Sequence, residues 1–170
     1  MLFAVKSKIP MVFIVGCLLM HLGCQQERKV GHIAPDVSLR DLSGRMVTLE
    51  EFRGSVMLLD FWATWCPPCR MSIPELIRLQ EKYGDKGLVI LGISLDDPGL
   101  YSNKFLLAFK EMAKINYTIL RYDQKVLKDY FGNESPAIPT MFLVDRQGKI
   151  RERFVGFRPG ALEKSLNGFL

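Results

Sequence analysis

The sequence predicts an α/β fold with a central mixed β-sheet flanked by helices on both faces. Residues 56–62 and 88–93 form nearly continuous apolar runs, as expected of strands that are buried on both faces. Residues 67–83 and 101–115 carry apolar side chains at near-helical spacing. Because these strands and helices alternate and a strand pair and a helix follow them, we expect a mixed sheet covered on both sides.

The segment before the first buried strand predicts a small N-terminal β-hairpin extension. Short apolar and polar alternations at residues 37–39 and 46–48 are separated by the turn residues Ser43 and Gly44. Residues 48–52 then form one capped helical turn that Gly54 ends.

The second half of the chain predicts four short elements and a final helix. We expect a strand at residues 117–121, a helix at 126–131, and a hairpin of strands at 140–144 and 150–155. The last helix begins at about Pro159.

Composition indicates one globular domain and excludes several function classes. The 170 residues are 48% hydrophobic and 24% charged, so a real core can form. Without residues 1–24 the charge is 21 Lys+Arg minus 18 Asp+Glu, or +3, and the scattered cations predict no nucleic-acid binding. Only His21 and His32 are present, and no second cysteine pair stands beside Cys66 and Cys69 in the domain, so we expect no metal site and no cofactor.

The N-terminus predicts export and membrane attachment. Lys6 and Lys8 precede an apolar stretch at residues 9–23, which has roughly the length of a signal-peptide core, and polar residues 25–29 follow. We therefore divide the chain into a signal or anchor at 1–24, a linker at 25–32 and a domain at 33–170. Positive charge before the apolar run favours an N-terminus inside the cell, with the domain outside the cytoplasm.

Cys24 is the candidate for lipid attachment. It follows Gly23, the small residue that resembles the position before a bacterial lipoprotein cleavage site, although His21 stands where such signals carry an apolar residue. Cys17 has a better local match but would leave a hydrophobic mature N-terminus. An uncleaved transmembrane anchor is the third alternative.

The sequence Cys66-Pro67-Pro68-Cys69 lies where a buried strand ends and a helix begins. A helix N-terminus presents unpaired N–H groups and a positive dipole end, which stabilise a thiolate relative to a thiol. One helical turn brings Cys69 back to Cys66, so Cys66 attacks and Cys69 resolves the mixed disulfide. The two prolines remove N–H donors and restrict the loop, so they influence the reduction potential.

The ten residues Asp60 to Cys69, DFWATWCPPC, resemble the active-site stretch of thioredoxins. Pro74 falls where thioredoxin-like proteins kink the active-site helix, and Ile138-Pro139-Thr140 resembles their cis-proline loop. The resemblance covers residues 33–170 and implies the thioredoxin fold and thiol-disulfide oxidoreductase activity. It also implies that Ile138, Pro139 and the rim residue Trp65 contact substrate.

The chain most resembles the membrane-anchored TlpA/ResA-like set, with an insertion after the second core strand at residues 97–118. That resemblance implies a monomer that reduces or exchanges disulfides in exported bacterial proteins, sometimes the haem-attachment cysteines of apocytochromes c. A transmembrane thiol carrier would supply the electrons.

Asp60 corresponds to the buried acid of thioredoxin, and an apolar strand should raise its pKa by desolvation. It is our first choice for the group that takes the proton from Cys69, directly or through one water. Some TlpA/ResA-like proteins instead place an acid after the second strand, which here is Asp97 or, as a weaker choice, Asp96.

Two other functions stay open at this point. A peroxiredoxin-like thiol peroxidase shares the fold, and residues 94–98 resemble its second-strand region, but it needs Thr three residues before the reactive cysteine and Thr64 stands two before Cys66. A redox-inert module would instead hold extended peptides at the Pro139 groove by backbone pairing.

Overall fold

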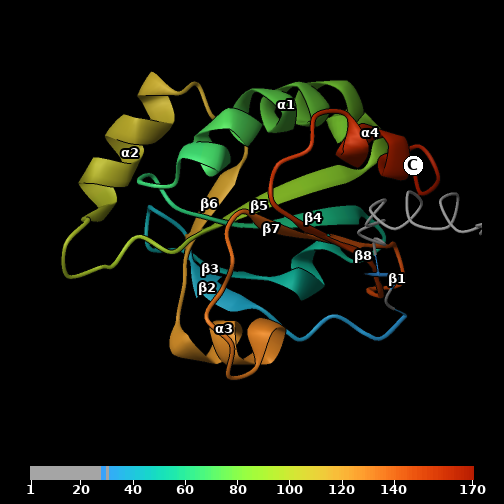
Figure 1. Cartoon of the computed structure of the whole chain (residues 1–170), viewed down its shortest axis with the longest axis horizontal. Helices are drawn as coiled ribbons and strands as arrows, with labels where there is room; N and C mark the ends of the chain where they lie inside the picture. The colour runs from blue at the N-terminus through green and yellow to red at the C-terminus, as the bar shows by residue number, and fades with distance from the viewer. Residues whose placement is uncertain (1–27, 30) are drawn as a thin grey trace, which may run out of the picture.

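A six-stranded mixed sheet forms the centre of the computed structural model, which describes residues 28–29 and 31–170 (Figure 1). Strand order is β1-β8-β7-β4-β5-β6, with β4, β5 and β6 parallel to one another and the remaining pairs antiparallel. The strands are β1 (Arg28–Lys29), β4 (Val56–Trp62), β5 (Leu88–Ser94), β6 (Thr118–Arg121), β7 (Thr140–Val144) and β8 (Ile150–Val155). The mixed sheet predicted from the sequence is confirmed.

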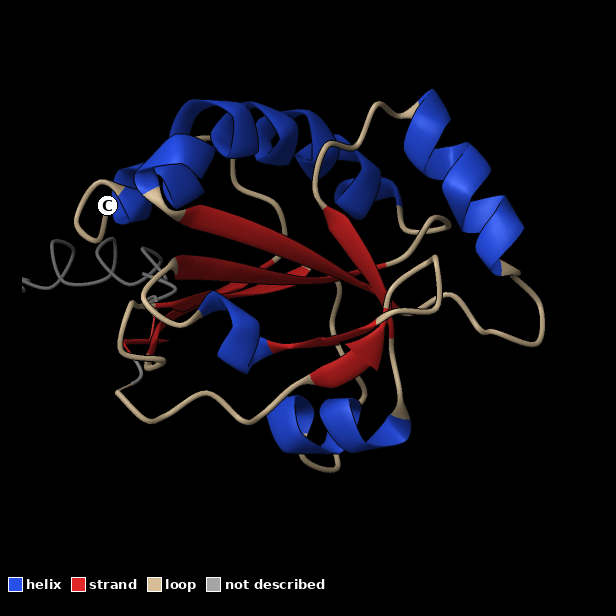
Figure 2. Cartoon of the chain, turned by 180° about the vertical axis from the view of Figure 1, so that it is seen from behind, coloured by secondary structure: helices blue, strands red, loops and turns tan. Residues whose placement is uncertain are grey.

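Helices cover both faces of this sheet (Figures 1 and 2). The helices α1 (Pro67–Tyr83), α2 (Asn103–Met112) and α4 (Ala161–Leu166) lie on one side, and α3 (Gln124–Phe131) lies on the other. Two short 3-10 helices complete the set, η1 (Leu49–Phe52) and η2 (Gly84–Lys86). Each face has its own apolar core: Leu76 and Leu79 of α1 belong to one, and Val126 of α3 belongs to the other.

The N-terminal hairpin forms as expected but remains outside the central sheet. Its strands β2 (Ser38–Arg40) and β3 (Met46–Thr48) pair antiparallel, and they join the α3 side of the core through Leu39 and Val47. The following turn is held by Glu51, whose carboxylate accepts a hydrogen bond from the Thr48 N–H at 2.7 Å.

β4 is the central strand, and all seven of its residues are buried. It pairs with β5 on one side and β7 on the other, so Asp60 faces Gly92 across one pairing and Met141 across the other. Because side chains alternate along a strand, Asp60 and Trp62 point to the α1 side, whereas Phe61 points to the α3 side. β4 therefore delivers Asp60 beneath the helix that carries the dithiol.

Two features of the fold were not predicted from the sequence. Residues 28 and 29, expected in a linker, form β1 and pair with Arg153 and Glu152 of β8. In α2 the predicted apolar face is only partly buried, because Phe105 is 44% exposed and Met112 is 74% exposed while Leu106 is fully buried. The reason is position: α2 stands beside the beginning of α1 rather than over the sheet (Figure 2).

The predicted N-terminal segment, with Cys24 and Cys17, lies outside the described residues. In the part of the chain that is described, no helix combines the length and hydropathy needed to cross a bilayer.

Candidate active site

Cys66 and Cys69 lie where the sequence predicted them, between the end of β4 and the first turn of α1. Cys66 is the N-cap of α1, and the Cys69 N–H donates to Cys66 Sγ at 3.2 Å. The two residues form a disulfide with their Cα atoms 5.3 Å apart. One helical turn therefore brings the sulfurs together, and the Cys69 N–H that reaches Cys66 Sγ is the first N–H group of α1, because Pro67 and Pro68 have none.

The dithiol is nearly buried, whereas its rim is open. Cys66 is 3% exposed and Cys69 1%, whereas Trp65 is 57% exposed. Pro67 and Pro68 are exposed as well. Cys66 is thus the more accessible sulfur, beside an indole that projects into solvent, as a residue that contacts a partner protein would.

The loop before β7 completes the site. The Ile138–Pro139 peptide bond is cis, as the resemblance implied. Pro139 is buried and Ile138 half-buried, and the Ile138 carbonyl oxygen lies 3.7 Å from Cys66 Sγ. The structure therefore brings together residues 72 positions apart in the chain, as a substrate-binding role for this loop requires.

Asp60 lies on the same face of β4 as Trp62, in the layer beneath the dithiol. Its side chain is 1% exposed, and burial raises its pKa to about 8, as expected for a carboxyl group in an apolar strand. No protein atom in the described residues donates a hydrogen bond to its Oδ1. A carboxyl group with this pKa can take up and release a proton near neutral pH.

The acidic residues after β5 have different environments. Asp97 is exposed, and its Oδ1 accepts a hydrogen bond from the Gly99 N–H at 2.7 Å. Asp96 is fully buried, and its carboxylate accepts from the Thr64 hydroxyl at 2.6 Å, the Thr64 N–H at 3.1 Å and the Ser94 hydroxyl at 2.8 Å. Proton transfer by Asp97 stays a prediction. The hydrogen bond to the Asp97 side chain lies within a local turn. Asp96, the weaker choice, accepts hydrogen bonds from Thr64 and so fixes the loop that leads to Cys66.

Arg121 links the segment that follows β5 to the insertion at residues 97–118. Its guanidinium donates to the Asp96 carbonyl at 3.0 Å and to the Tyr101 carbonyl at 3.1 Å. Sequence reasoning missed Thr64, Ser94 and Arg121 as parts of the site. The available signal was the alternation of Ser94 and Asp96 at the end of a buried strand, which places both polar side chains on one side of it.

Within residues 28–29 and 31–170, no three His, Cys, Asp or Glu side chains gather closely enough to hold a metal ion.

Comparison with known proteins identifies relatives of one chemical class. The model of the AhpC/TSA family matches residues 30–153. The thioredoxin-like protein YneN of Bacillus subtilis is 35% identical over 126 residues, which are 74% of this chain and 71% of YneN. The thiol-disulfide oxidoreductase ResA of Geobacillus thermodenitrificans is 39% identical over 127 residues, 75% of this chain and 70% of ResA.

A solved structure agrees with these relatives. The crystal structure assigned to a thiol:disulfide interchange protein DsbE of Chlorobium tepidum superposes with a TM-score of 0.70 at 35% identity. The superposition covers 84% of this chain and 98% of the Chlorobium tepidum chain. Fold and sequence thus point to the same group of proteins.

The Asp96 contacts predict that two adjacent aspartates differ sharply in their effect on stability. An Asp96→Asn change replaces one accepting oxygen by an NH2 group in a buried site, so it should lower the free energy of unfolding by roughly 1–3 kcal/mol. Asp97→Asn is the matched control and should change it by less than about 0.5 kcal/mol. Urea denaturation of the oxidised proteins measures both values, and equal effects would contradict the assigned contacts.

The buried carboxyl group of Asp60 predicts a pH dependence of stability. Its pKa is about 8 in the folded chain against 3.8 for the unperturbed group, so between these values the folded state holds a proton that the unfolded state has lost. The contribution of Asp60 to stability is therefore full below about pH 4 and is lost as the pH rises toward 8. Asp60→Asn does not ionise, so its stability relative to the parent should rise by up to a few kcal/mol from pH 4 to pH 8. Denaturation at several pH values tests this, and a difference that does not vary with pH would contradict it.

Proposed function

The chain belongs to the AhpC/TSA family and is a thiol-disulfide oxidoreductase with a thioredoxin-like fold, and we propose that it reduces disulfides of exported bacterial proteins. One observation carries the proposal: the Cys66–Cys69 disulfide closes at the N-terminus of α1 beside the cis-proline loop. This arrangement supports attack on a disulfide that is held next to Cys66.

The first step uses Cys66 in its reduced form. The Cys69 N–H, which is the first N–H group of α1, and the positive end of the helix dipole stabilise the Cys66 thiolate. This thiolate attacks one sulfur of the substrate disulfide, forms a mixed disulfide and releases the other substrate sulfur as a thiolate that takes a proton from water. The Ile138 carbonyl beside Cys66 Sγ supports backbone pairing with the substrate at this point.

The second step uses Cys69 and Asp60. In the molecules in which Asp60 is ionised, its carboxylate accepts the proton of the Cys69 thiol, directly or through one water, and the Cys69 thiolate attacks Cys66 Sγ. The Cys66–Cys69 disulfide forms, and the substrate leaves as its second thiolate. Two electrons have then moved from the enzyme to the substrate, and Asp60 returns its proton to solvent.

The enzyme must be reduced again before the next turnover. A transmembrane thiol carrier that delivers electrons from the cytoplasm is the partner that we propose for this step. The proposal rests on an extracytoplasmic position, which the lysines and the apolar run before residue 24 support. Attachment to the membrane, through lipidated Cys24 or an uncleaved anchor, would keep the protein near that carrier.

Apocytochrome c is the substrate that we propose within the exported proteins. Its haem-attachment cysteines lie in a short CxxC segment, and extended backbone of this kind suits the rim formed by Trp65 and the Ile138–Pro139 loop. The peroxidase alternative has weaker support, because the hydroxyl of Thr64 donates to Asp96 rather than to a group at Cys66.

Trapping of mixed disulfides tests this function. With Cys69→Ser the first step proceeds but the second cannot, so the full chain should accumulate covalent complexes with exported proteins in bacterial cells. Cys66→Ser is the matched control and should trap far fewer, since Cys69, the remaining cysteine of the pair, is 1% exposed and Cys17 and Cys24 are present in both variants. Non-reducing gels and mass spectrometry of the adducts are the measurement.

Three outcomes would overturn parts of the proposal. Equal trapping by both variants would contradict the role of Cys66. Adducts that consist only of cytoplasmic proteins would contradict the extracytoplasmic position. Rapid consumption of hydrogen peroxide without disulfide reduction would favour the peroxidase.

A further inference from the structure

Two aromatic rings meet over Gly92, the β5 residue that pairs with Asp60. A Cβ atom at Gly92 would lie 3.0 Å from Trp62 Nε1 and 3.1 Å from Tyr117 Cε2. Any larger residue at this position would push one ring away. Gly92 therefore allows the indole of Trp62 and the phenol of Tyr117 to lie against the sheet beside the Asp60 carboxyl group.

The polar atoms of these three side chains are buried and have no protein partner. Asp60, Trp62 and Tyr117 are each at most 3% exposed. In the described part of the chain five buried side-chain atoms have no hydrogen-bond partner, and Asp60 Oδ1, Trp62 Nε1 and Tyr117 Oη are three of them. Buried polar groups are nearly always paired, and these three atoms form no hydrogen bond with one another in the structure, so the three side chains next to Gly92 are the candidates to pair with one another.

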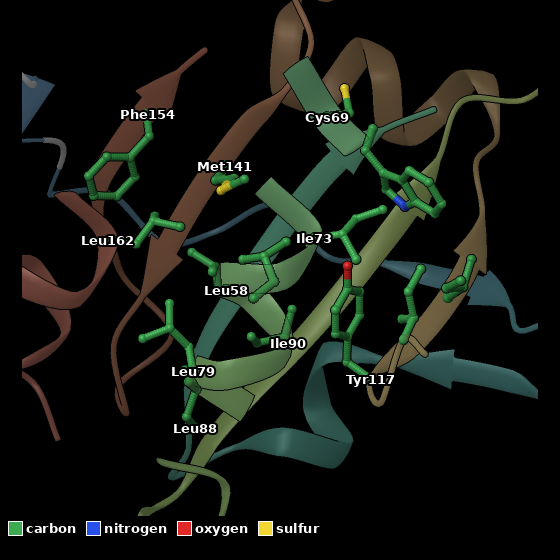
Figure 3. Packing of buried hydrophobic residues seen from close by; sticks show 14 of the residues in the cluster. Leu58, Cys69, Ile73, Leu79, Leu88, Ile90, Tyr117, Met141, Phe154 and Leu162 are labelled. Atoms are coloured by element: carbon green, nitrogen blue, oxygen red, sulfur yellow. The ribbon is translucent and has the colours of Figure 1, made fainter. Parts of the chain in front are cut away.

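Their chemistry is complementary. An indole N–H only donates, a carboxylate only accepts, and a phenol that keeps its proton can donate. Burial, and secondarily the charge of Asp60, raises the pKa of Tyr117 well above its usual value, so the phenol remains protonated. The group thus offers two donors to a single acidic acceptor. Figure 3 shows the Tyr117 hydroxyl pointing to the part of the core where Ile73 and Cys69 of α1 lie.

The described residues around these side chains come from several elements. Phe109 of α2 contacts the Trp62 ring, Lys110 of α2 contacts Tyr117, Gly92 and Met141 pair with Asp60, and Cys69, Ile73 and Ile119 belong to the same core cluster. Of these, Cys69 and Lys110 titrate. The ammonium of Lys110 donates to the backbone carbonyl of Tyr117 at 2.8 Å, so it is engaged by the chain rather than by Asp60.

We propose that Tyr117, whose ring lies beside Trp62 Nε1 over Gly92, is a positioning residue for the dithiol reaction and donates a hydrogen bond from its hydroxyl to the ionised carboxylate of Asp60. A small rotation of the phenol or carboxyl, or one buried water that both groups bind, completes this contact. The proposal rests on the proposed role of Asp60 as the acceptor of the Cys69 proton.

Tyr117 itself gives up no proton in this scheme. Asp60 as carboxylate accepts the Cys69 proton, and the resulting thiolate breaks the mixed disulfide as the Cys66–Cys69 bond forms. The Tyr117 hydroxyl stabilises the ionised form before the transfer and loses most of that interaction afterwards. It therefore lowers the proton affinity that burial alone would impose on Asp60, and keeps the carboxylate available near neutral pH.

Tyr117→Phe in the full chain tests the proposal, because it removes the hydroxyl and keeps the ring that contacts Gly92. Tyr130→Phe is the matched control: its buried hydroxyl donates to the Pro35 carbonyl on the opposite face of the sheet. The titration midpoint of the Asp60 carboxyl is measured by carbon-13 NMR in both variants and the parent. The pH dependence of Cys69-mediated release from a mixed disulfide is measured in parallel.

We expect the Asp60 midpoint to rise by about one pH unit in Tyr117→Phe and to stay unchanged in Tyr130→Phe, since a hydrogen bond to a carboxylate and one pKa unit have similar free energies. The pH at which the release rate falls to half on the acidic side should rise by the same amount. An unchanged midpoint in Tyr117→Phe, or an equal rise in Tyr130→Phe, would overturn the inference. A midpoint that rises while the release rate keeps its pH profile would support the Tyr117 contact and contradict Asp60 as the proton acceptor.

Discussion

The pairing of β4 on both of its edges is the constraint on which the rest of the site depends. Because β5 and β7 hold this strand in the middle of the sheet, every residue from Val56 to Trp62 is buried and the chain leaves the sheet at one defined point. Four residues separate the end of β4 from the start of α1, with Cys66 as the N-cap, so the positive end of the helix lies at the edge of the core. The position of the reactive sulfur is thus a consequence of strand pairing and helix initiation.

Burial in the core also determines what the acidic side chains near the dithiol can do. Two carboxylates lie in the core near the dithiol, and their surroundings differ. Asp96 accepts hydrogen bonds from Thr64 and Ser94 and so anchors the loop before Cys66. Asp60 Oδ1 has no donor among the described protein atoms besides those that we propose over Gly92, and burial raises the pKa of Asp60 to about 8. One acid serves architecture and the other is poised to exchange a proton.

Sequence reasoning succeeded where a pattern is local. Strands were predicted at residues 56–62, 140–144 and 150–155, which are the bounds of β4, β7 and β8. These predictions needed only local patterns, namely continuous apolar runs and two strands joined by a turn. Sequence reasoning could not show that Asp96 is buried and Asp97 exposed, since which side chain turns inward depends on how β5 ends against the loop at Thr64. The contact over Gly92 was equally hidden, because it requires the register in which Asp60 pairs with Gly92.

The central claim, that the Cys66–Cys69 pair works as a reductant, is tested most directly by its reduction potential. The full chain is equilibrated in glutathione or dithiothreitol buffers, and the thiol fraction is read by alkylation. A potential near that of thioredoxin, about −270 mV, is the result that this account predicts. A value near −120 mV would contradict it, because the protein would then be an oxidant that introduces disulfides.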